Sequence, residues 1–131
     1  MLDHCEFRAK NFMTFSVLKT VPDAHEDAIW SLTWTNKSNR ILTGSIDDTV
    51  KMWSGESAAH MRTLDGHNLG VTSVVSSANG VYAASASLDS QIRIWDVLQH
   101  SLIKYIDAGP MEAWVNTICN FSLFRFLPME A

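Results

Sequence analysis

Cysteine and long apolar runs are scarce in this chain. Its 131 residues include only two cysteines, Cys5 and Cys119, whose spacing fits neither a disulfide framework nor a zinc site. We therefore expect free thiols in a reducing compartment. No apolar run approaches the ~20 residues of a membrane helix, and Asp3, Glu6 and Lys10 interrupt the apolar core that a signal peptide would need. These absences predict an intracellular soluble protein that binds no membrane.

Positive charge is also in short supply. The chain has 10 Lys and Arg residues against 14 Asp and Glu residues, a net charge of −4. A nucleic-acid surface needs a clustered basic face, so direct binding to RNA or DNA is disfavoured. Three histidines, His4, His60 and His100, show no ligand spacing with one another or with a cysteine. We expect these three on the surface, and we predict neither a metal site nor a cofactor.

What the chain does contain is an internal repeat. Three pairs of residues recur at one offset of 42 positions: His25 and His67, Asp47 and Asp89, and Trp53 and Trp95. A period near 40 residues, with Gly-His near its start and Trp-Asp at its end, is typical of a β-propeller blade. The sequence therefore predicts an all-β fold in which each blade has four antiparallel strands. It holds two complete repeats and the start of a third.

Eight segments are predicted to be strands, because apolar and polar residues alternate in them and polar turns separate them. In the first repeat, residues 24–65, they are Ala28–Trp34, Arg40–Ser45, Thr49–Trp53 and Ala59–Leu64. In the second repeat, residues 66–107, they are Val71–Ser76, Val81–Ala86, Gln91–Trp95 and Leu102–Ile106. The pair Asn79-Gly80 is a strong hairpin signal within the second repeat.

The two ends of the chain differ from these repeats. Residues 1–23 form an N-terminal extension with one candidate strand, at residues 12–20. Residues 108–131 begin a third repeat, in which Gly109 occupies the histidine position and the pattern stops after Val115. Blades draw much of their stability from their neighbours. We therefore expect the chain to be marginally stable, oligomeric or prone to aggregation, with half-buried faces that contain Val50, Met52, Ile92 and Ile94.

Each complete repeat carries a His, a Ser or Thr, an Asp and a Trp at matching positions. The first set is His25, Thr43, Asp47 and Trp53, and the second is His67, Ser85, Asp89 and Trp95. An imidazole N–H can satisfy the buried carboxylate, while the hydroxyl can join the other ring nitrogen to the indole N–H. Each set is therefore predicted to be a structural tetrad that ties a turn to two strands.

Ser85, His67 and Asp89 also match the residue types of an acyl-transfer triad. The same set occurs twice, however, with Thr43 in place of Ser85, and a hydrolase does not need its triad in tandem. No nucleophile-elbow motif surrounds Ser85. We therefore predict no catalytic residue and no enzyme activity, and keep a hydrolase as a weaker alternative that the Ser85→Ala variant tests.

The repeats resemble the WD-repeat family, and a narrower resemblance rests on longer runs. These are AHEDAIWS (24–31), TGSIDDTVKMW (43–53), LDGHNLGVTSV (64–74), ASASLDSQIRIWD (84–96) and IDAGPMEAW (106–114). They look like the N-terminal part of the WD-repeat subunits of the superkiller complex. The last run is the most telling, because it is not a general WD-repeat feature.

That resemblance implies a closed seven-bladed propeller without catalytic activity, present in cytoplasm and nucleus. Its expected role is a scaffold that joins the helicase and tetratricopeptide subunits of the superkiller complex in exosome-linked 3′-to-5′ mRNA decay. The resemblance also implies that, in the nucleus, the partners are subunits of the polymerase-associated-factor elongation complex. A general WD-repeat adaptor in ubiquitin ligation or signalling, and a non-functional truncated product, remain alternatives.

Trp30 and Trp114 are the candidate partner-binding residues. Both fall at the start of the first strand of a repeat, where propellers direct side chains toward the top face. The equivalent residue of the second repeat is Thr72, so the fold does not require tryptophan there. Each is either a core aromatic residue or an anchor for a protein partner, since exposed tryptophan is enriched at interface hot spots.

Overall fold

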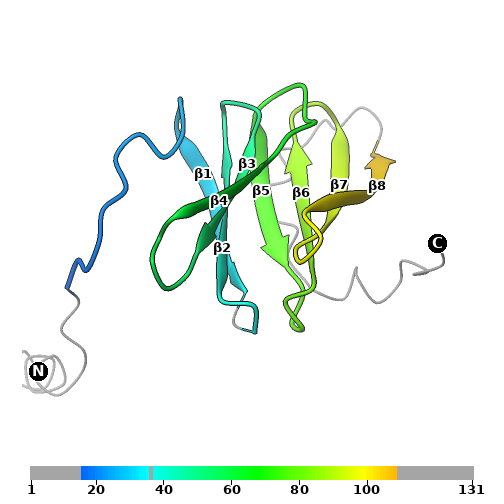
Figure 1. Cartoon of the computed structure of the whole chain (residues 1–131). Helices are drawn as coiled ribbons and strands as arrows, with labels where there is room; N and C mark the ends of the chain where they lie inside the picture. The colour runs from blue at the N-terminus through cyan, green and yellow to red at the C-terminus, as the bar shows by residue number, and fades with distance from the viewer. Residues whose placement is uncertain (1–15, 36, 109–131) are drawn as a thin grey trace, which may run out of the picture.

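The computed structural model describes residues 16–35 and 37–108, and this part of the chain forms two four-stranded antiparallel sheets (Figure 1). Blade 1 consists of β1 (Ile29–Thr35), β2 (Arg40–Ser45), β3 (Val50–Ser54) and β4 (His60–Leu64). Blade 2 consists of β5 (Val71–Ser76), β6 (Tyr82–Ser87), β7 (Gln91–Asp96) and β8 (Ser101–Asp107). Every strand pairs with the strand that precedes or follows it in the chain, so each blade is a simple meander.

The prediction of blades with four antiparallel strands is confirmed, and each strand begins and ends within one residue of its predicted bounds. The tight turns between the second and third strands also lie at equivalent positions in the two blades. Asp48 and Ser90, at the same repeat position, have positive φ values of 69° and 64°. A preceding aspartate supports each turn: Asp47 and Asp89 accept hydrogen bonds from backbone N–H groups two residues on, the usual arrangement of an Asx turn.

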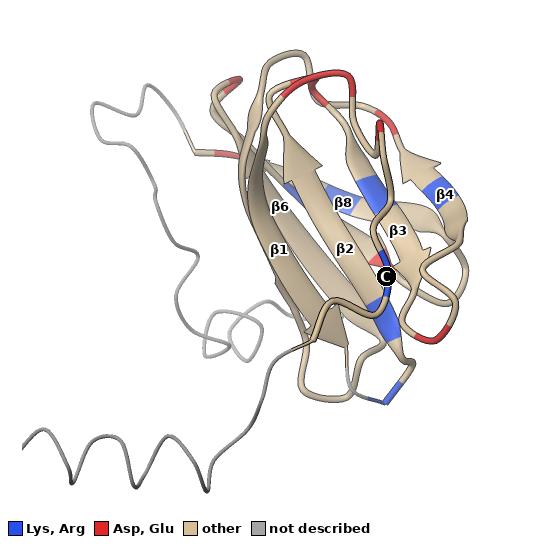
Figure 2. Ribbon diagram, turned by 90° about the vertical axis from the view of Figure 1, so that its left-hand side faces the viewer, with Lys and Arg blue, Asp and Glu red and all other residues tan. Residues whose placement is uncertain are grey.

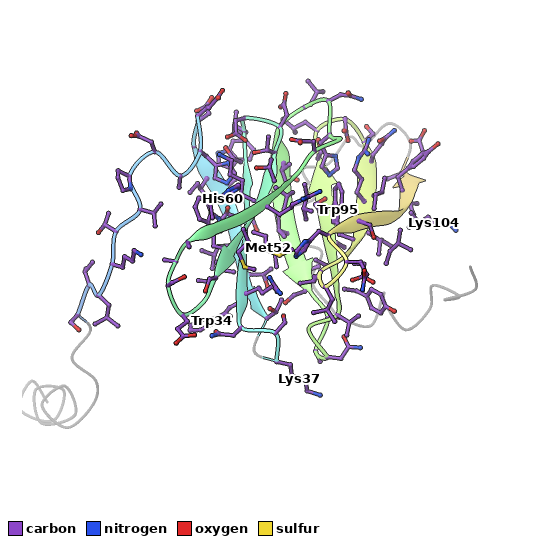
Figure 3. The ribbon with its side chains drawn as sticks, viewed as in Figure 1. Trp34, Lys37, Met52, His60, Trp95 and Lys104 are labelled. Atoms are coloured by element: carbon purple, nitrogen blue, oxygen red, sulfur yellow. The ribbon has the colours of Figure 1, made fainter. Side chains whose placement is uncertain are left out.

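The main core lies between the two blades. It joins one face of blade 1 to one face of blade 2, and its members are Leu42, Val50, Met52, Leu64, Val71, Val74, Ala83, Trp95 and Val97. Met52 from blade 1 and Trp95 from blade 2, both labelled in Figure 3, are members of this core. The expectation that Val50 and Met52 are half buried is wrong, because blade 2 covers both completely.

Gly44 permits this close packing. A Cβ atom at Gly44 would lie 2.6 Å from Val74 Cγ2 and 2.7 Å from Val71 Cγ1, closer than carbon atoms can approach. The glycine therefore allows the backbone of β2 to approach the side chains of β5 directly.

Each blade has a second face that no other described element covers. On blade 2 this face holds a smaller cluster of Ala84, Ala86 and Ile94, with Val75, Ile92 and Ile106 packed at its border. On blade 1 the outward side chains of β1 are largely exposed, Leu32 at 63% and Trp34 at 57%. The second face of blade 1 is therefore exposed along β1, whereas the centre of the second face of blade 2 is buried, with Ile94 only 7% exposed. The expectation that Ile94 is half buried is thus wrong as well.

The candidate strand of the N-terminal extension is described only in part. Residues 16–20 are exposed and form no strand, since they pair with neither sheet, and residues 12–15 lie outside the described residues. The predicted start of a third repeat and both cysteines also lie outside them. Within residues 16–35 and 37–108, no helix is long and apolar enough to cross a membrane.

Candidate functional site

The structure brings the four residues of the first tetrad together. Nδ1 of His25 lies 2.8 Å from Oδ2 of Asp47, and Nε2 of His25 lies 2.7 Å from Oγ1 of Thr43. Trp53 Nε1 donates to the same Thr43 oxygen over 2.9 Å. Because an ionised carboxylate only accepts and an indole N–H only donates, the hydrogen bonds run in one direction from Trp53 to Asp47. The network ties β3, β2, the β2–β3 turn and the loop before β1 together.

The second tetrad repeats this geometry in blade 2. Nδ1 of His67 lies 3.0 Å from Oδ2 of Asp89, and Nε2 of His67 lies 2.7 Å from Oγ of Ser85. Trp95 Nε1 donates to Ser85 Oγ over 2.8 Å. Backbone N–H groups of Asn68 and Gln91 complete the shell around the aspartate. Every polar side-chain atom that the tetrad buries therefore has a partner.

Hydrogen bonding controls the charge of Asp47. Burial alone would raise the pKa of this carboxyl, but hydrogen bonds from Thr49, His25 and the backbone N–H of Glu26 outweigh burial and lower the pKa to about 2. The carboxylate is thus held ionised, which keeps it an acceptor for three neighbours at once.

In blade 2 burial has opposite effects on the two titratable partners. Burial lowers the pKa of His67, and the adjacent Asp89 offsets this only in part, so the ring favours its neutral form. Burial would raise the pKa of Asp89, but the backbone N–H groups of Asn68 and Gln91, together with His67, lower it. The folded state therefore favours a neutral imidazole beside an ionised carboxylate.

The geometry around Ser85 does not favour a nucleophilic role. Its side chain is 0% exposed, and its oxygen is held between His67 and the indole N–H of Trp95. A hydrolytic serine must reach a substrate carbonyl. Thr43 is bound in the same way at the equivalent position of blade 1. The shared geometry is that of a structural brace.

The remaining histidines show no grouping with other metal ligands. His60 is exposed and shares a 3.1 Å hydrogen bond with Thr63. Its ring packs edge-on against the Trp53 ring, with 5.2 Å between the ring centroids. His100 is partly buried, and His4 lies outside the described residues. No group of at least 3 His, Cys, Asp or Glu residues within the described ranges could hold a metal ion.

Comparison with known families decides the relationship. The WD domain, G-beta repeat model matches residues 15–54 and 59–96, segments that include both sheets up to β7. This chain belongs to the WD-repeat family. The structure of U3-55K has the same fold, with a TM-score of 0.62 at 19% identity over 65% of this chain and 26% of that one. WD-repeat proteins act as scaffolds for protein partners, and the absence of a substrate-accessible nucleophile in either tetrad agrees with that role.

Two WD-repeat relatives have substantial sequence identity to the chain. WD repeat-containing protein VIP3 of Arabidopsis thaliana is 39% identical over 106 residues, covering 78% of this chain and 33% of that protein. Superkiller complex protein 8 of Dictyostelium discoideum is 34% identical over 100 residues, covering 74% of this chain and 33% of that protein. The chain therefore spans about a third of the length of the curated relatives it matches.

Trp30, one of the two candidate partner-binding residues, is 47% exposed in this WD-repeat structure. It lies at the register shift between Ile29 and Ser31, where β1 has one residue more than β2. Such a β-bulge redirects a side chain out of the regular alternation. Thr72 lies at the equivalent shift in β5. Trp114, the second candidate, lies outside the described residues.

The exposure of the apolar residues that follow Trp30 on the same strand was not predicted from the sequence. Leu32 and Trp34 alternate with Ser31, Thr33 and Thr35, a pattern visible in the sequence. That pattern says which residues share a face, but it does not say which face a neighbour covers.

Charge is distributed unevenly on the WD-repeat structure. Most Asp and Glu residues lie on loops at the upper end in Figure 2, whereas Lys and Arg lie mainly along strands. The acidic loops include Glu26 and Asp27 before β1, and Asp47 and Asp48 between β2 and β3. Phosphate groups would be repelled at this end of the molecule, so a protein is the better partner for it.

Proposed function

We propose that this WD-repeat chain is a non-catalytic scaffold of the superkiller type, which binds the tetratricopeptide and helicase subunits of that complex. The observation that carries the proposal is its 34% identity to Superkiller complex protein 8 over 74% of the chain. The run IDAGPMEAW adds support, because it is not shared by WD repeats in general. Action in the cytoplasm in mRNA decay, and in the nucleus with the elongation complex, is part of the same proposal.

Trp30 is the residue proposed to anchor the partner. It is large, about half exposed, and held at a bulge on the strand end that follows the acidic loop of Glu26 and Asp27. An aromatic anchor beside acidic residues fits a partner helix that presents an apolar pocket flanked by lysine or arginine. Packing does not require tryptophan at this position, since Thr72 occupies it in blade 2.

The test is a pull-down of the purified 131-residue chain with the recombinant tetratricopeptide subunit of the superkiller complex. We expect a complex of defined stoichiometry that Trp30→Ala weakens about 10-fold or more, as at other tryptophan hot spots. Trp34→Ala is the matched control, because Trp34 lies on the same strand and is similarly exposed. A chain that is folded but does not bind this subunit would overturn the proposal, and binding that both variants retain would exclude Trp30 as the anchor.

A further inference from the structure

A small polar pocket lies between two turns of blade 1. The β1–β2 and β3–β4 turns both lie at the lower end of this blade in Figure 1, away from the acidic loops. The backbone N–H of Gly55 joins them by donating to the carbonyl oxygen of Asn39 over 2.8 Å. The pocket has a volume of about 190 Å³ and is lined by Ser38, Asn39, Arg40, Ser54, Glu56 and Met61. Small-molecule sites usually measure about 300–1,000 Å³, so this one fits a single side chain better than a cofactor or a metabolite.

Arg40 places a cation in this pocket without a carboxylate partner among the described residues. The ion pairs found in residues 16–35 and 37–108 join only His25 to Asp47 and His67 to Asp89. Nη1 of Arg40 instead lies 2.9 Å from the sulfur of Met61 and 3.9 Å from that of Met52. Its Nε, which is buried, has no hydrogen-bond partner in the same part of the chain. A thioether is only a weak acceptor, so a carboxylate would be a far stronger partner for this guanidinium.

Comparison with blade 2 shows which group is missing beside Arg40. Arg40 lies directly opposite Ser54 in the pairing of β2 with β3, so their side chains share one face. Ser54 follows Trp53 at the position where blade 2 has Asp96 after Trp95. That aspartate belongs to the Trp-Asp signature of the repeat. Blade 1 therefore combines an arginine with a serine where the signature would supply a carboxylate.

Ser54 keeps the structural role of the signature aspartate. Its Oγ accepts hydrogen bonds from two backbone N–H groups of the β3–β4 turn, over 3.3 and 3.2 Å. Oδ1 of Asp96 accepts two equivalent bonds in the β7–β8 turn, over 2.8 and 2.7 Å. The turn thus forms with either residue, and what serine lacks in comparison with aspartate is the negative charge.

Two further residues of the pocket have hydrogens that they can donate. Asn39 Oδ1 accepts from Trp34 Nε1 over 3.2 Å, and its amide nitrogen donates to no other described residue. Ser54 Oγ already accepts twice, and its hydroxyl hydrogen has no acceptor within the described ranges. Together with Arg40, three residues therefore offer donors to one pocket. A carboxylate, which only accepts hydrogen bonds, complements this set.

We propose that this pocket binds the carboxylate of an aspartate or glutamate side chain from a protein partner. The Arg40 guanidinium neutralises the carboxylate, and the Asn39 amide and the Ser54 hydroxyl orient it. Trp30 lies at the other end of β1 from the β1–β2 turn. The pocket is thus a second contact, separate from the one assigned to Trp30, and its partner segment is acidic.

Glu56 favours a carboxylate over a phosphate group as the ligand. It is exposed and is the one acidic residue among those that line the pocket. Its charge repels a phosphate dianion more strongly than a singly charged carboxylate. Its removal should therefore tighten the binding of the carboxylate about 2- to 5-fold, the range of an exposed charge pair.

The test is a titration of the 131-residue chain with the peptide acetyl-Gly-Glu-Gly-amide, followed by NMR at the Nε–H resonance of Arg40. The absence of this resonance from Arg40→Gln assigns it. We expect a saturable shift with this peptide and no shift with acetyl-Gly-Gln-Gly-amide, which has the same shape without the charge. Inorganic phosphate should bind more weakly than the glutamate peptide, and Glu56→Gln should bind the peptide more tightly than the unmodified chain.

Ser54→Asp is the variant that separates binding from folding. It supplies the signature carboxylate beside Arg40 and retains an acceptor for the turn, as Asp96 does in blade 2. It should be folded and bind the glutamate peptide about 10-fold or more weakly, the loss expected for a hydrogen bond to a charged group. Ser54→Asn is the matched control, since it has the same shape without the charge and should retain binding. Circular dichroism establishes that both variants are folded.

Four results would overturn the proposal. They are equal responses to the glutamate and glutamine peptides, undiminished binding by folded Ser54→Asp, tighter binding of phosphate than of the glutamate peptide, and binding by Glu56→Gln alone. The last result would make Glu56 itself the occupant of the pocket. None of these readouts involves a superkiller subunit, so this test and that of the proposed function fail independently.

Discussion

Blade 1 and blade 2 have the same strand order, corresponding turns and the same tetrad, yet they differ in how much of each face is buried. Blade 1 buries Leu42 and Met52 completely and exposes Leu32. Blade 2 buries Val74, the equivalent of Leu32, and also Ala84 and Ile94, the equivalents of Leu42 and Met52. The internal geometry of a blade is thus set by its own sequence, while the burial of each face is set by its neighbour. Repeat proteins divide their stability between these two contributions in the same way.

Among the substitutions that test this comparison, we expect the largest loss of stability at Met52. Met52→Ala removes a completely buried side chain from between the blades and should lower the free energy of unfolding by about 3 kcal/mol. Ile94→Ala, at the equivalent position of blade 2, should cost less, about 2 kcal/mol, because Ile94 is buried in a smaller cluster with Ala84 and Ala86. Urea denaturation of the two variants measures both losses. Equal losses would mean that the contact between blades adds no stability.

A glycine offers the next test. Gly44→Ala places a methyl group against Val71 and Val74, and should destabilise the chain by about 1–3 kcal/mol through overpacking. The reverse exchange, Ala86→Gly, removes a buried methyl group from the second face of blade 2 and should cost about 1 kcal/mol, through lost packing and the lower strand preference of glycine. Thermal denaturation of the two variants compares them. A Gly44→Ala protein as stable as the unmodified chain would show that the blades are not in tight contact there.

Substitutions in the tetrads should lower the stability of the chain somewhat less. Ser85→Ala leaves His67 Nε2 and Trp95 Nε1 without their shared partner, at a cost of about 1–3 kcal/mol. We expect Ser85→Thr, which restores the hydroxyl that blade 1 uses, to recover most of this loss. Denaturation curves of the three proteins measure it. A Ser85→Ala protein of unchanged stability that had lost a hydrolase activity would instead support the triad.

The smallest expected effect is a gradual loss of stability as the pH is lowered. The folded-state pKa of His67 is below that of the unfolded chain, so its contribution to stability is complete above the usual histidine pKa and is lost as the pH falls through that range. Asp47 and Asp89, whose pKa values are also lowered in the folded state, lose their contributions only below the usual aspartate pKa, Asp47 down to about 2. Unfolding free energies measured from pH 8 to pH 3 should fall in two stages. His67→Asn should remove the first stage, and a profile flat across both ranges would contradict the assignment.

The strands and the residues of both tetrads could be predicted because each depends on local pattern and on one repeat offset. The alternation along β3, for example, determines that Val50 and Met52 share a face. It does not determine that blade 2 covers this face, which depends on packing between segments distant in sequence. The exposure of Leu32 and Trp34 was missed for the same reason, since only the arrangement of the blades shows which face lacks a neighbour.

The meander of each blade has a kinetic consequence. Because every strand pairs with a strand adjacent in the chain, and each tetrad is complete by its third strand, a blade can assemble from local contacts as soon as its segment emerges from the ribosome. The face of blade 1 that holds Met52 then remains exposed to solvent until β5 is synthesised. Apolar surface of the nascent chain is exposed during that interval, which ends when Val71 and Val74 pack against Gly44.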